Sequence, residues 1–225
     1  MDRPWEKTQS AARATLEATK KQVEHGLELH RNLLVCDAFS FDPKLYTQRV
    51  IRSYNQRVKE GASAQDIKST FGDLFAKEVV ENRKAQEMYL RLFREAGVDC
   101  LVMNVGAKGE SIPYMTRTLA RNAYKLDGLK KHMTKAINAD DVREAKAAGR
   151  LSMVWSTNGV PMLGEWDDFE RELLWPEIFW RLGVRMMHLT YNRRNHIASG
   201  CCETHDGGLS DYGHDVVRRM NEIGI

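Results

Sequence analysis

The sequence predicts an α/β fold, a partial (β/α)8 TIM-like barrel of about four strand–helix units with helical insertions. Three observations indicate it. Short apolar runs typical of buried strands recur along the chain, segments with helical periodicity separate them, and several of these segments end at a glycine. Strands joined by helices in this way are typical of right-handed parallel units. A closed eight-unit barrel takes about 250 residues, so 225 residues with long helical insertions accommodate about half of one.

The first predicted elements are a helical extension and a strand. Apolar residues recur at helical spacing over about residues 10–30, which predicts a helix. We therefore separate residues 1–32, an N-terminal helical extension, from residues 33–225, the N-terminal half of the barrel. The run 33–36 is short, apolar and bounded by Asp37, so it is interpreted as the first buried strand.

Two long helices and a second strand come next. Residues 44–60 and 64–96 have helical periodicity and are separated at Gly61. The second of these helices carries a broad apolar stripe, which predicts that it faces the core, and it ends at Gly97. The apolar run 98–103 is the second predicted strand.

The rest of the chain continues this alternation of helix and strand. The remaining predicted elements are a helix over 111–137, a short helix over 140–148, a third strand over 151–155, a helix over 167–182, a fourth strand over 184–190 and a final helix over 211–223. The short helix begins with acidic residues, which suit the positive end of its dipole. Gly224 is the expected end of the final helix.

Half a barrel has open edges. Two parallel edge strands with unpaired backbone groups are a liability for a monomer, which leaves three explanations: a truncated product, a subunit completed by a second chain, or a homodimer that closes the barrel. The expected partner is therefore a second copy in a homo-oligomer or a second chain completing the barrel. A doubly wound open sheet is the alternative fold, although no Gly-x-Gly-x-x-Gly turn follows the first strand.

Composition and charge exclude several classes of function. The net charge is +3, with Lys and Arg interleaved with Asp and Glu, so the electrostatic footprint of nucleic-acid binding is missing. The N-terminus lacks the apolar core of a signal peptide, and no apolar run is long enough to cross a membrane. Two of the four cysteines are adjacent and two lie in apolar runs, which favours reduced thiols and a cytoplasmic location.

Four loops follow predicted strands at the edge where parallel barrels carry their chemistry. They share polar side chains and cover residues 37–42, 104–106, 156–159 and 190–195. The same residue types also stabilise tight turns without any ligand, so turn chemistry is the competing interpretation for each loop taken alone. The placement of all four loops at one edge favours a site there.

A segment rich in cysteine and histidine offers two other chemistries. Thiolate and imidazole are preferred zinc ligands, and the candidates are His196, Cys201, Cys202, His205 and His214. Their spacing fits no known zinc motif, so structural roles are favoured. A cysteine hydrolase, with Cys201 as nucleophile and His205 as base, is a further alternative that rests only on their proximity in the sequence.

Several segments together resemble one protein family. They are residues 29–38, 93–98, 141–150, 180–185, 189–195, 200–201 and 208–213. The chain thereby resembles the membrane dipeptidase (renal dipeptidase) family of metal-dependent peptidases, from about Leu27 to Ile225. The resemblance implies a (β/α)8 barrel that binds two zinc ions and hydrolyses dipeptides through a metal-bound hydroxide. It also implies that this chain corresponds to the N-terminal half of that barrel.

The resemblance also implies where zinc ligands belong. Two of them belong at the end of the first strand, where this sequence has Phe39 and Phe41. The bridging carboxylate belongs at the end of the third strand, where Thr157 stands, and Glu165 lies too far along the chain to replace it. Zinc is the cofactor that the family resemblance implies, yet we expect no family metal ligand in this half.

Tyr191, Asn192 and Asn195 match the family's substrate-facing loop, so the resemblance implies that they bind a small amide or dipeptide-like ligand. Two functions follow. The first is a metal-dependent hydrolase of amide or peptide bonds, present as a fragment or subunit whose barrel and active site need a second half. The alternative is a catalytically inactive dipeptidase-like protein, a pseudoenzyme that acts as a ligand-binding or partner-binding subunit.

Overall fold

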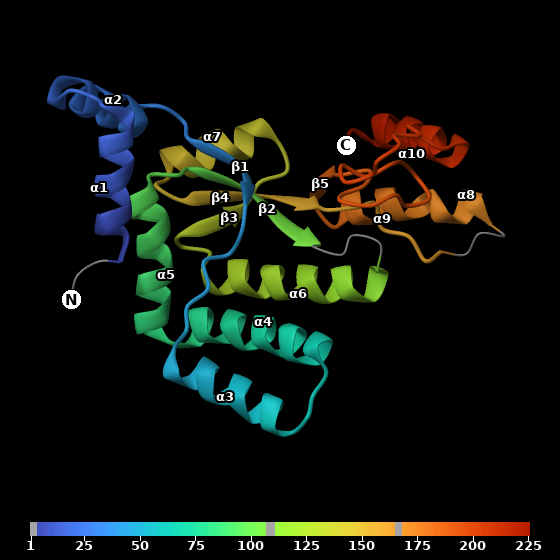
Figure 1. Ribbon diagram of the computed structural model, residues 1–225, viewed down its shortest axis with the longest axis horizontal. Helices are drawn as coiled ribbons and strands as arrows, with labels where there is room; N and C mark the ends of the chain where they lie inside the picture. Colours follow the sequence, from blue (N-terminus) through green and yellow to red (C-terminus); the bar gives the residue numbers. More distant parts are fainter. Residues whose placement is uncertain (1–3, 107–110, 165–167) are drawn as a thin grey trace. The chain divides into compact units, whose positions relative to one another are not determined.

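Two compact units make up the chain in a computed structural model, which describes residues 4–106, 111–164 and 168–225 (Figure 1). The first unit is Met1–Val35 and the second is Cys36–Ile225. The boundary between the two units lies after Val35, slightly later than the predicted boundary after residue 32.

The first unit holds two helices where the sequence predicted one. Helix α1 covers Pro4–Leu16 and α2 covers Lys20–Asn32. The interruption lies at Glu17, which has a φ of 48°, a conformation that side chains other than glycine rarely adopt. Thr19 then caps α2, because its hydroxyl accepts from the N–H of Gln22 and its own N–H donates to the Gln22 side chain at 2.9 Å.

In the described residues, the second unit is built on a sheet of five parallel strands (Figure 1). The strands are β1 (Cys36–Ser40), β2 (Cys100–Gly106), β3 (Met133–Lys135), β4 (Leu151–Thr157) and β5 (Val184–Met187). They are ordered β1-β2-β4-β3, and β5 also pairs with β4. The predicted α/β fold with a parallel sheet is confirmed, with one strand more than the four expected.

Strand β1 lies further along the chain than predicted. The predicted range is 33–36, but the strand runs over Cys36–Ser40 because Cys36 pairs with Cys100 at the start of β2. Four of its five residues are exposed. Within the described residues it pairs on one side only, with β2, so it is an edge strand.

Three helices connect β1 to β2. They are α3 (Gln48–Lys59), α4 (Ala64–Glu81) and α5 (Arg83–Ala96). The single helix predicted over 64–96 is divided at Asn82, whose side-chain oxygen accepts from the N–H groups of Lys84 and Ala85 and so caps α5. Helix α3 begins later than predicted because Thr47 provides its N-terminal cap.

Strand β3 is the element that the sequence analysis missed. The helix predicted over 111–137 is shorter in the structure: α6 covers only Ile112–Gly128, and β3 follows after a turn. The three residues of β3 pair with the first three of β4. A strand of three residues is too short to show the alternation that identifies strands in a sequence.

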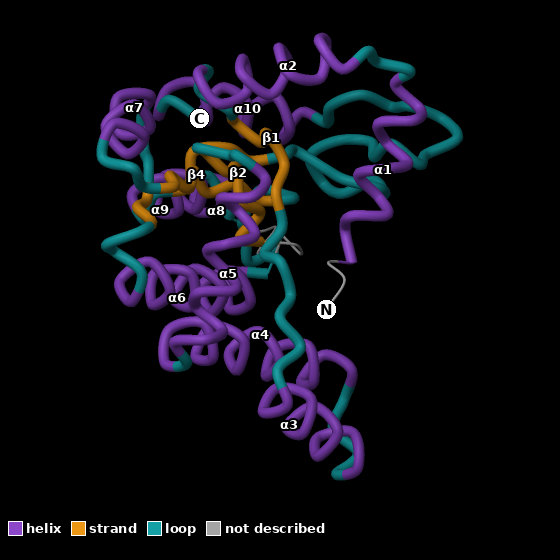
Figure 2. The backbone as a smooth tube through the Cα atoms, turned by 90° about the vertical axis from the view of Figure 1, so that its left-hand side faces the viewer, coloured by secondary structure: helices purple, strands orange, loops and turns teal. Residues whose placement is uncertain are grey.

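The order of the strands decides which face each helix covers. Helix α6 leads from β2 to β3, whereas α7 (Ala139–Ala147) leads back from β3 to β4. Connections between parallel strands are right-handed as a rule. The chain crosses the sheet in one direction from β2 to β3 and in the opposite direction from β3 to β4, so the two connecting helices are expected on opposite faces. Figures 1 and 2 show α7 on one side of the sheet and α6, with α4 beyond it, on the other.

The last helices of the second unit are α8 (Phe169–Glu172), α9 (Leu174–Arg181) and α10 (Asp211–Ile223). The first two stand in place of the single helix predicted over 167–182, of which residue 167 lies outside the described residues. Helix α10 has its predicted bounds and ends at Gly224, which has a φ of 84°. Across the part of the chain that the structure describes, no helix combines the length and the apolar character of a membrane span.

The cores of the second unit lie on both sides of the sheet. The main core contains Leu101 and Met103 of β2 together with helical residues such as Phe75 and Leu119. A smaller core beside α7 contains Cys100, Ala136 and Val142. Neighbouring residues of β2 therefore face opposite cores, as the alternation of side chains along a strand requires.

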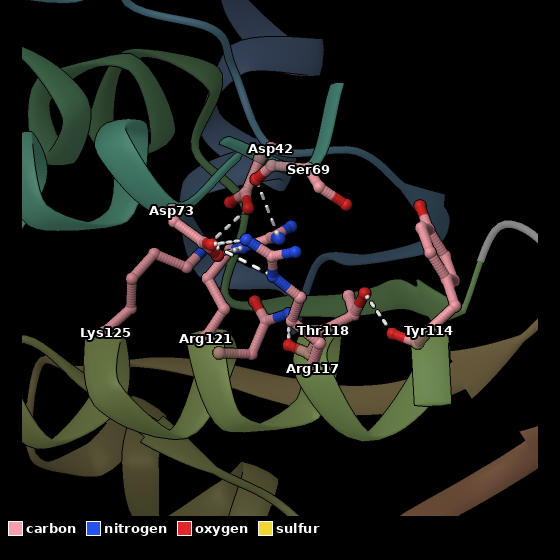
Figure 3. Close-up of polar contacts among 9 residues, drawn as sticks. Asp42, Ser69, Asp73, Tyr114, Arg117, Thr118, Arg121 and Lys125 are labelled. Atoms are coloured by element: carbon pink, nitrogen blue, oxygen red, sulfur yellow. Dashed lines mark hydrogen bonds and ion pairs between the residues drawn. The ribbon is translucent and has the colours of Figure 1, made fainter. Parts of the chain in front are cut away.

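An ion pair between a buried lysine and a half-buried aspartate holds the segment that follows β1. The carboxylate of Asp42 accepts from the hydroxyl of Tyr89 at 2.7 Å and from the ammonium of Lys125, whose side chain is 2% exposed. Figure 3 shows Lys125 of α6 reaching Asp42, beside the pairs that Asp73 of α4 forms with two arginines of α6. These contacts fix the end of β1 relative to α5 and α6.

Candidate functional site

The carboxyl ends of four strands meet at one edge of the sheet. Strand β1 ends at Ser40, β2 at Gly106, β4 at Thr157 and β5 at Met187. Because these strands are parallel, their carboxyl ends and the loops that follow share this edge. We call it the rim, and it gathers the loops that the sequence analysis selected.

Four aromatic side chains form a continuous row along the rim, and we call them the aromatic row. In spatial order they are Phe41, Phe39, His188 and Tyr191. Their successive ring centroids are 5.0, 5.8 and 6.4 Å apart, separations typical of favourable aromatic pairs. Phe39 and Phe41 meet edge to face at 89°, whereas His188 lies nearly parallel to both of its neighbours, at 17° and 21°.

The aromatic row indicates that the sheet is curved. Strands β1 and β5 are separated by β2 and β4, so they would lie about 14 Å apart in a flat sheet with a spacing of about 4.8 Å. Phe39 of β1 nevertheless stacks on His188, the residue after β5, at 5.8 Å. Contact across two intervening strands indicates that the sheet curls toward this face, as a barrel requires.

The rim does not fit the zinc centre that the family resemblance implies. Phe39 and Phe41 stand at two of the expected ligand positions, and a phenyl ring offers a metal no lone pair. Thr157, at the third, is buried, and its hydroxyl donates to the carbonyl of Gly159 at 2.7 Å. The described part of the chain holds no group of three or more His, Cys, Asp or Glu suited to a metal. Glu165 lies outside the described residues.

Three buried polar atoms at or just after the carboxyl ends of β2 and β4 have no hydrogen-bond partner among the described residues. They are Nδ2 of Asn104, Oγ of Ser156 and Oδ1 of Asn158. Asn104 and Ser156 are paired neighbours on β2 and β4, so their side chains face the same side of the sheet. Because a buried unpaired polar group costs about 1–3 kcal/mol, these atoms are suited to a partner from water or from a ligand.

The loop after β5 holds the predicted residues Tyr191, Asn192 and Asn195 in different ways. Tyr191 is 47% exposed and belongs to the aromatic row. Asn195 orders the loop, because its Nδ2 donates to the carbonyl of Leu189 at 2.9 Å and its Oδ1 accepts from two N–H groups later in the loop. Asn192 is exposed and lies next to two thiols.

The adjacent cysteines pack against the same loop. The Sγ atoms of Cys201 and Cys202 are 3.9 Å apart, and Sγ of Cys201 is 3.6 Å from Oδ1 of Asn192. The hydrogen bond with Cys202, followed by burial, raises the pKa of the Cys201 thiol. Since the thiolate is the reactive form, this environment gives the cysteine-hydrolase hypothesis no support.

His188 is the rim residue that the sequence analysis did not select. It falls inside the predicted fourth strand, 184–190, whereas β5 ends at Met187. The N–H of His188 donates to the carbonyl of Thr157 at 3.0 Å, which fixes it beside the end of β4. The polar residues that follow Met187 were the available indication that the strand ends early.

A comparison with protein families gives a match over most of the second unit. The model of the family described as membrane dipeptidase (peptidase family M19) matches residues 63–225. Dipeptidase tcpJ of Claviceps purpurea (strain 20.1) is 35% identical over 95 residues, which are 41% of this chain and 21% of that protein. The resemblance found in the sequence is thereby confirmed.

Two solved structures share the fold. The amidohydrolase from Pseudomonas aeruginosa has a TM-score of 0.59 and 19% identity, covering 88% of this chain and 46% of its own. The probable dipeptidase PvdM from the same organism has a TM-score of 0.56 and 16% identity, covering 92% of this chain and 49% of its own. At these identities the likeness shows the fold alone. The chain spans about half the length of these solved relatives.

Proposed function

The chain belongs to the membrane dipeptidase family, peptidase family M19, and from that premise we propose that its rim binds a small amide or dipeptide-like ligand without a two-zinc centre. The family is one of metal-dependent hydrolases, so the proposal concerns what this chain's own residues do at the family's site. In this account the chain is a dipeptidase-like binding protein.

One observation carries the proposal: the side chains at the implied ligand positions include no imidazole and no carboxylate. Phe39 and Phe41 pack edge to face with their ring centroids 5.0 Å apart, and the hydroxyl of Thr157 is bonded to a backbone carbonyl. Two neighbouring zinc ions need a bridging anion and several further nitrogen or oxygen ligands. The loss of three ligands from one half of the site removes that shell.

The unpaired atoms near the rim complement an amide. Nδ2 of Asn104 is a donor suited to a carbonyl oxygen, Oδ1 of Asn158 is an acceptor suited to an amide N–H, and the Ser156 hydroxyl serves as either. The aromatic row adds an apolar surface for a ligand side chain. Because the three atoms are buried, a ligand reaches them by displacing side chains that cover them.

Calorimetric titration with the dipeptide Ala-Phe tests the proposal. We expect saturable binding to the wild-type chain, and we expect Asn104→Ala and Tyr191→Ala each to weaken it by about 3- to 30-fold, through a lost hydrogen bond or aromatic contact. The matched control is Tyr124→Ala, which removes an exposed tyrosine of α6 outside the rim and should leave affinity unchanged. Absence of binding, or unchanged affinity in both folded rim variants, contradicts the proposal.

A metal-dependent hydrolase completed by a second half is the second candidate function, and the open edge of β1 favours it. Four of the five residues of β1 are exposed, and within the described residues the strand has one neighbour. A second chain or a second copy paired with this edge would extend the sheet toward a closed barrel. Such a partner would have to supply the metal ligands that the rim lacks.

The oxidation state of the cysteines indicates a cellular compartment for the protein. All four are free thiols, including the adjacent pair Cys201 and Cys202. Free exposed thiols persist in a reducing compartment, so we propose a cytoplasmic location. Fractionation of cells that produce the protein tests it, and recovery in an oxidising compartment would exclude it.

A further inference from the structure

A second concave site lies along α3 and α4, and it shares no residue with the rim. It is a groove of about 530 Å³, which we call the α3–α4 groove. This volume is within the range of about 300–1,000 Å³ that small-molecule sites occupy. Helices α3 and α4 pack side by side as a pair (Figures 1 and 2), and the residues before α3 complete the lining.

Three aromatic rings form the apolar part of the α3–α4 groove. The ring centroid of Phe71, in α4, is 6.0 Å from that of Tyr46 and 6.3 Å from that of Tyr54 in α3. The two tyrosines are 65% and 44% exposed, so much of this aromatic surface is uncovered. Rings at these separations present edges and faces against which a planar ligand packs favourably.

The charged residues of the α3–α4 groove are both lysines. Lys44 precedes α3 and Lys68 lies in α4, and both side chains are exposed. Among the described residues that line the groove, none is acidic. The groove therefore joins an aromatic surface to two positive charges, and this combination favours a ligand that is aromatic and anionic.

The segment that carries Lys44 and Tyr46 is anchored on the protein. Asp42 is paired with the buried ammonium of Lys125, and Leu45 is 5% exposed. Anchors on both sides of Lys44 limit its movement before a ligand arrives. Preorganisation of this kind lowers the entropic cost of binding.

We propose that the α3–α4 groove binds an aromatic carboxylate. The ring of the ligand packs against Phe71 and the two tyrosines, and its carboxylate pairs with Lys44 and Lys68. A neutral aromatic compound cannot form the ion pairs with the two lysines, and the two lysines repel a cationic one. The site is additional to the rim and does not depend on the function proposed there.

Calorimetric titration of the full chain with naphthoate tests this inference, with naphthalenemethanol as the neutral compound of similar shape. We expect naphthoate to bind at least about 5-fold more tightly than the alcohol, with an affinity that falls as salt rises. Lys44→Gln and Lys68→Gln should each weaken naphthoate by about 2- to 5-fold, as for exposed charge pairs. Lys59→Gln removes an exposed lysine of α3 outside the groove and should have no effect.

Methyl NMR of isoleucine-labelled protein locates the binding site. Ile51 and Ile67 line the groove, whereas Ile178 of α9 does not. We expect naphthoate to shift the methyl signals of Ile51 and Ile67 and to leave that of Ile178 in place. The inference is overturned by equal affinity for the alcohol, by unchanged affinity in both groove variants, by unshifted Ile51 and Ile67 signals, or by no binding at all.

Discussion

Asn195 makes three hydrogen bonds to the backbone of its own loop, to the carbonyl of Leu189 and from the N–H groups of Ile197 and Ala198. Replacing it by alanine leaves these half-buried backbone groups without that partner. We therefore expect Asn195→Ala to lower the free energy of unfolding by about 1–3 kcal/mol. Urea unfolding followed by circular dichroism measures the change.

The control for this prediction is Asn192→Ala, in the same loop. Asn192 is exposed and its side chain lies near two thiols, which are weak donors. We expect this variant to change the free energy of unfolding by less than about 0.5 kcal/mol. Equal effects in the two variants would show that Asn195 does not order the loop.

Some residues of the rim can be predicted from the sequence, and others can be found only in the structure. The family resemblance alone predicts Phe39, Phe41 and Tyr191 as rim residues. The aromatic row that unites them depends on the curvature of the sheet, which no local pattern encodes. The unpaired atoms Nδ2 of Asn104 and Oγ of Ser156 lie side by side because β2 pairs with β4, and the sequence does not specify that register.

At the scale of elements, the contact between α4 and α6 includes a carboxylate shared by two guanidinium groups. Burial by itself raises the pKa of Asp73, but hydrogen bonds from Arg117 and Arg121 outweigh it and hold that pKa below its ordinary value of 3.8. A carboxyl group whose pKa is lowered on folding contributes stability above its ordinary pKa, and the contribution is lost as the pH falls through the lower folded value.

We therefore expect Asp73→Asn to destabilise the protein at neutral pH and the difference from wild type to shrink as the pH falls below 3.8. Urea unfolding at a series of pH values measures it. The matched control is Asp127→Asn, an exposed aspartate in α6 outside this contact, which we expect to change the stability at neutral pH by less than about 0.5 kcal/mol. A difference between Asp73→Asn and wild type that does not change with pH contradicts this account of the contact.

Strand β1 is the element through which we expect the chain to associate. Its residue Ala38 is exposed on the edge strand, where a lysine would oppose pairing with another strand. We expect Ala38→Lys to shift the protein toward the monomer in sedimentation-velocity experiments over a range of concentrations. Ala147→Lys, at an exposed position of α7, should leave association unchanged. Identical sedimentation of the Ala38→Lys variant and wild type would exclude β1 as the interface.

Helices with clear start and end residues were predicted well, whereas the longest predicted helices and the strands that depend on pairing were not. Helices α7 and α10 lie within one residue of their predicted bounds because they have clear start and end residues. The break at Asn82 was missed because the apolar stripe continues across it, and its capping role is visible only in the structure. Strand β1 was misplaced because its residues are exposed, and pairing with β2 defines it more than hydrophobicity does.

At the scale of the whole molecule, the second unit has a fold of the dipeptidase family, and an aromatic row lies along its rim. The family match over residues 63–225 and the parallel sheet establish the fold. At the positions where the resemblance implies zinc ligands, this sequence has Phe39, Phe41 and Thr157, and we propose that the rim therefore holds no two-zinc centre. The fold and the family match therefore both indicate a dipeptidase-family protein. The function that we propose for its rim is the binding of a ligand.

Zinc content tests this central claim most directly. The purified chain is incubated with excess zinc, desalted to remove weakly held metal, and analysed by inductively coupled plasma mass spectrometry together with its protein concentration. The aromatic side chains at the ligand positions predict less than one tightly bound zinc ion per chain. Two tightly bound zinc ions per chain would contradict the account.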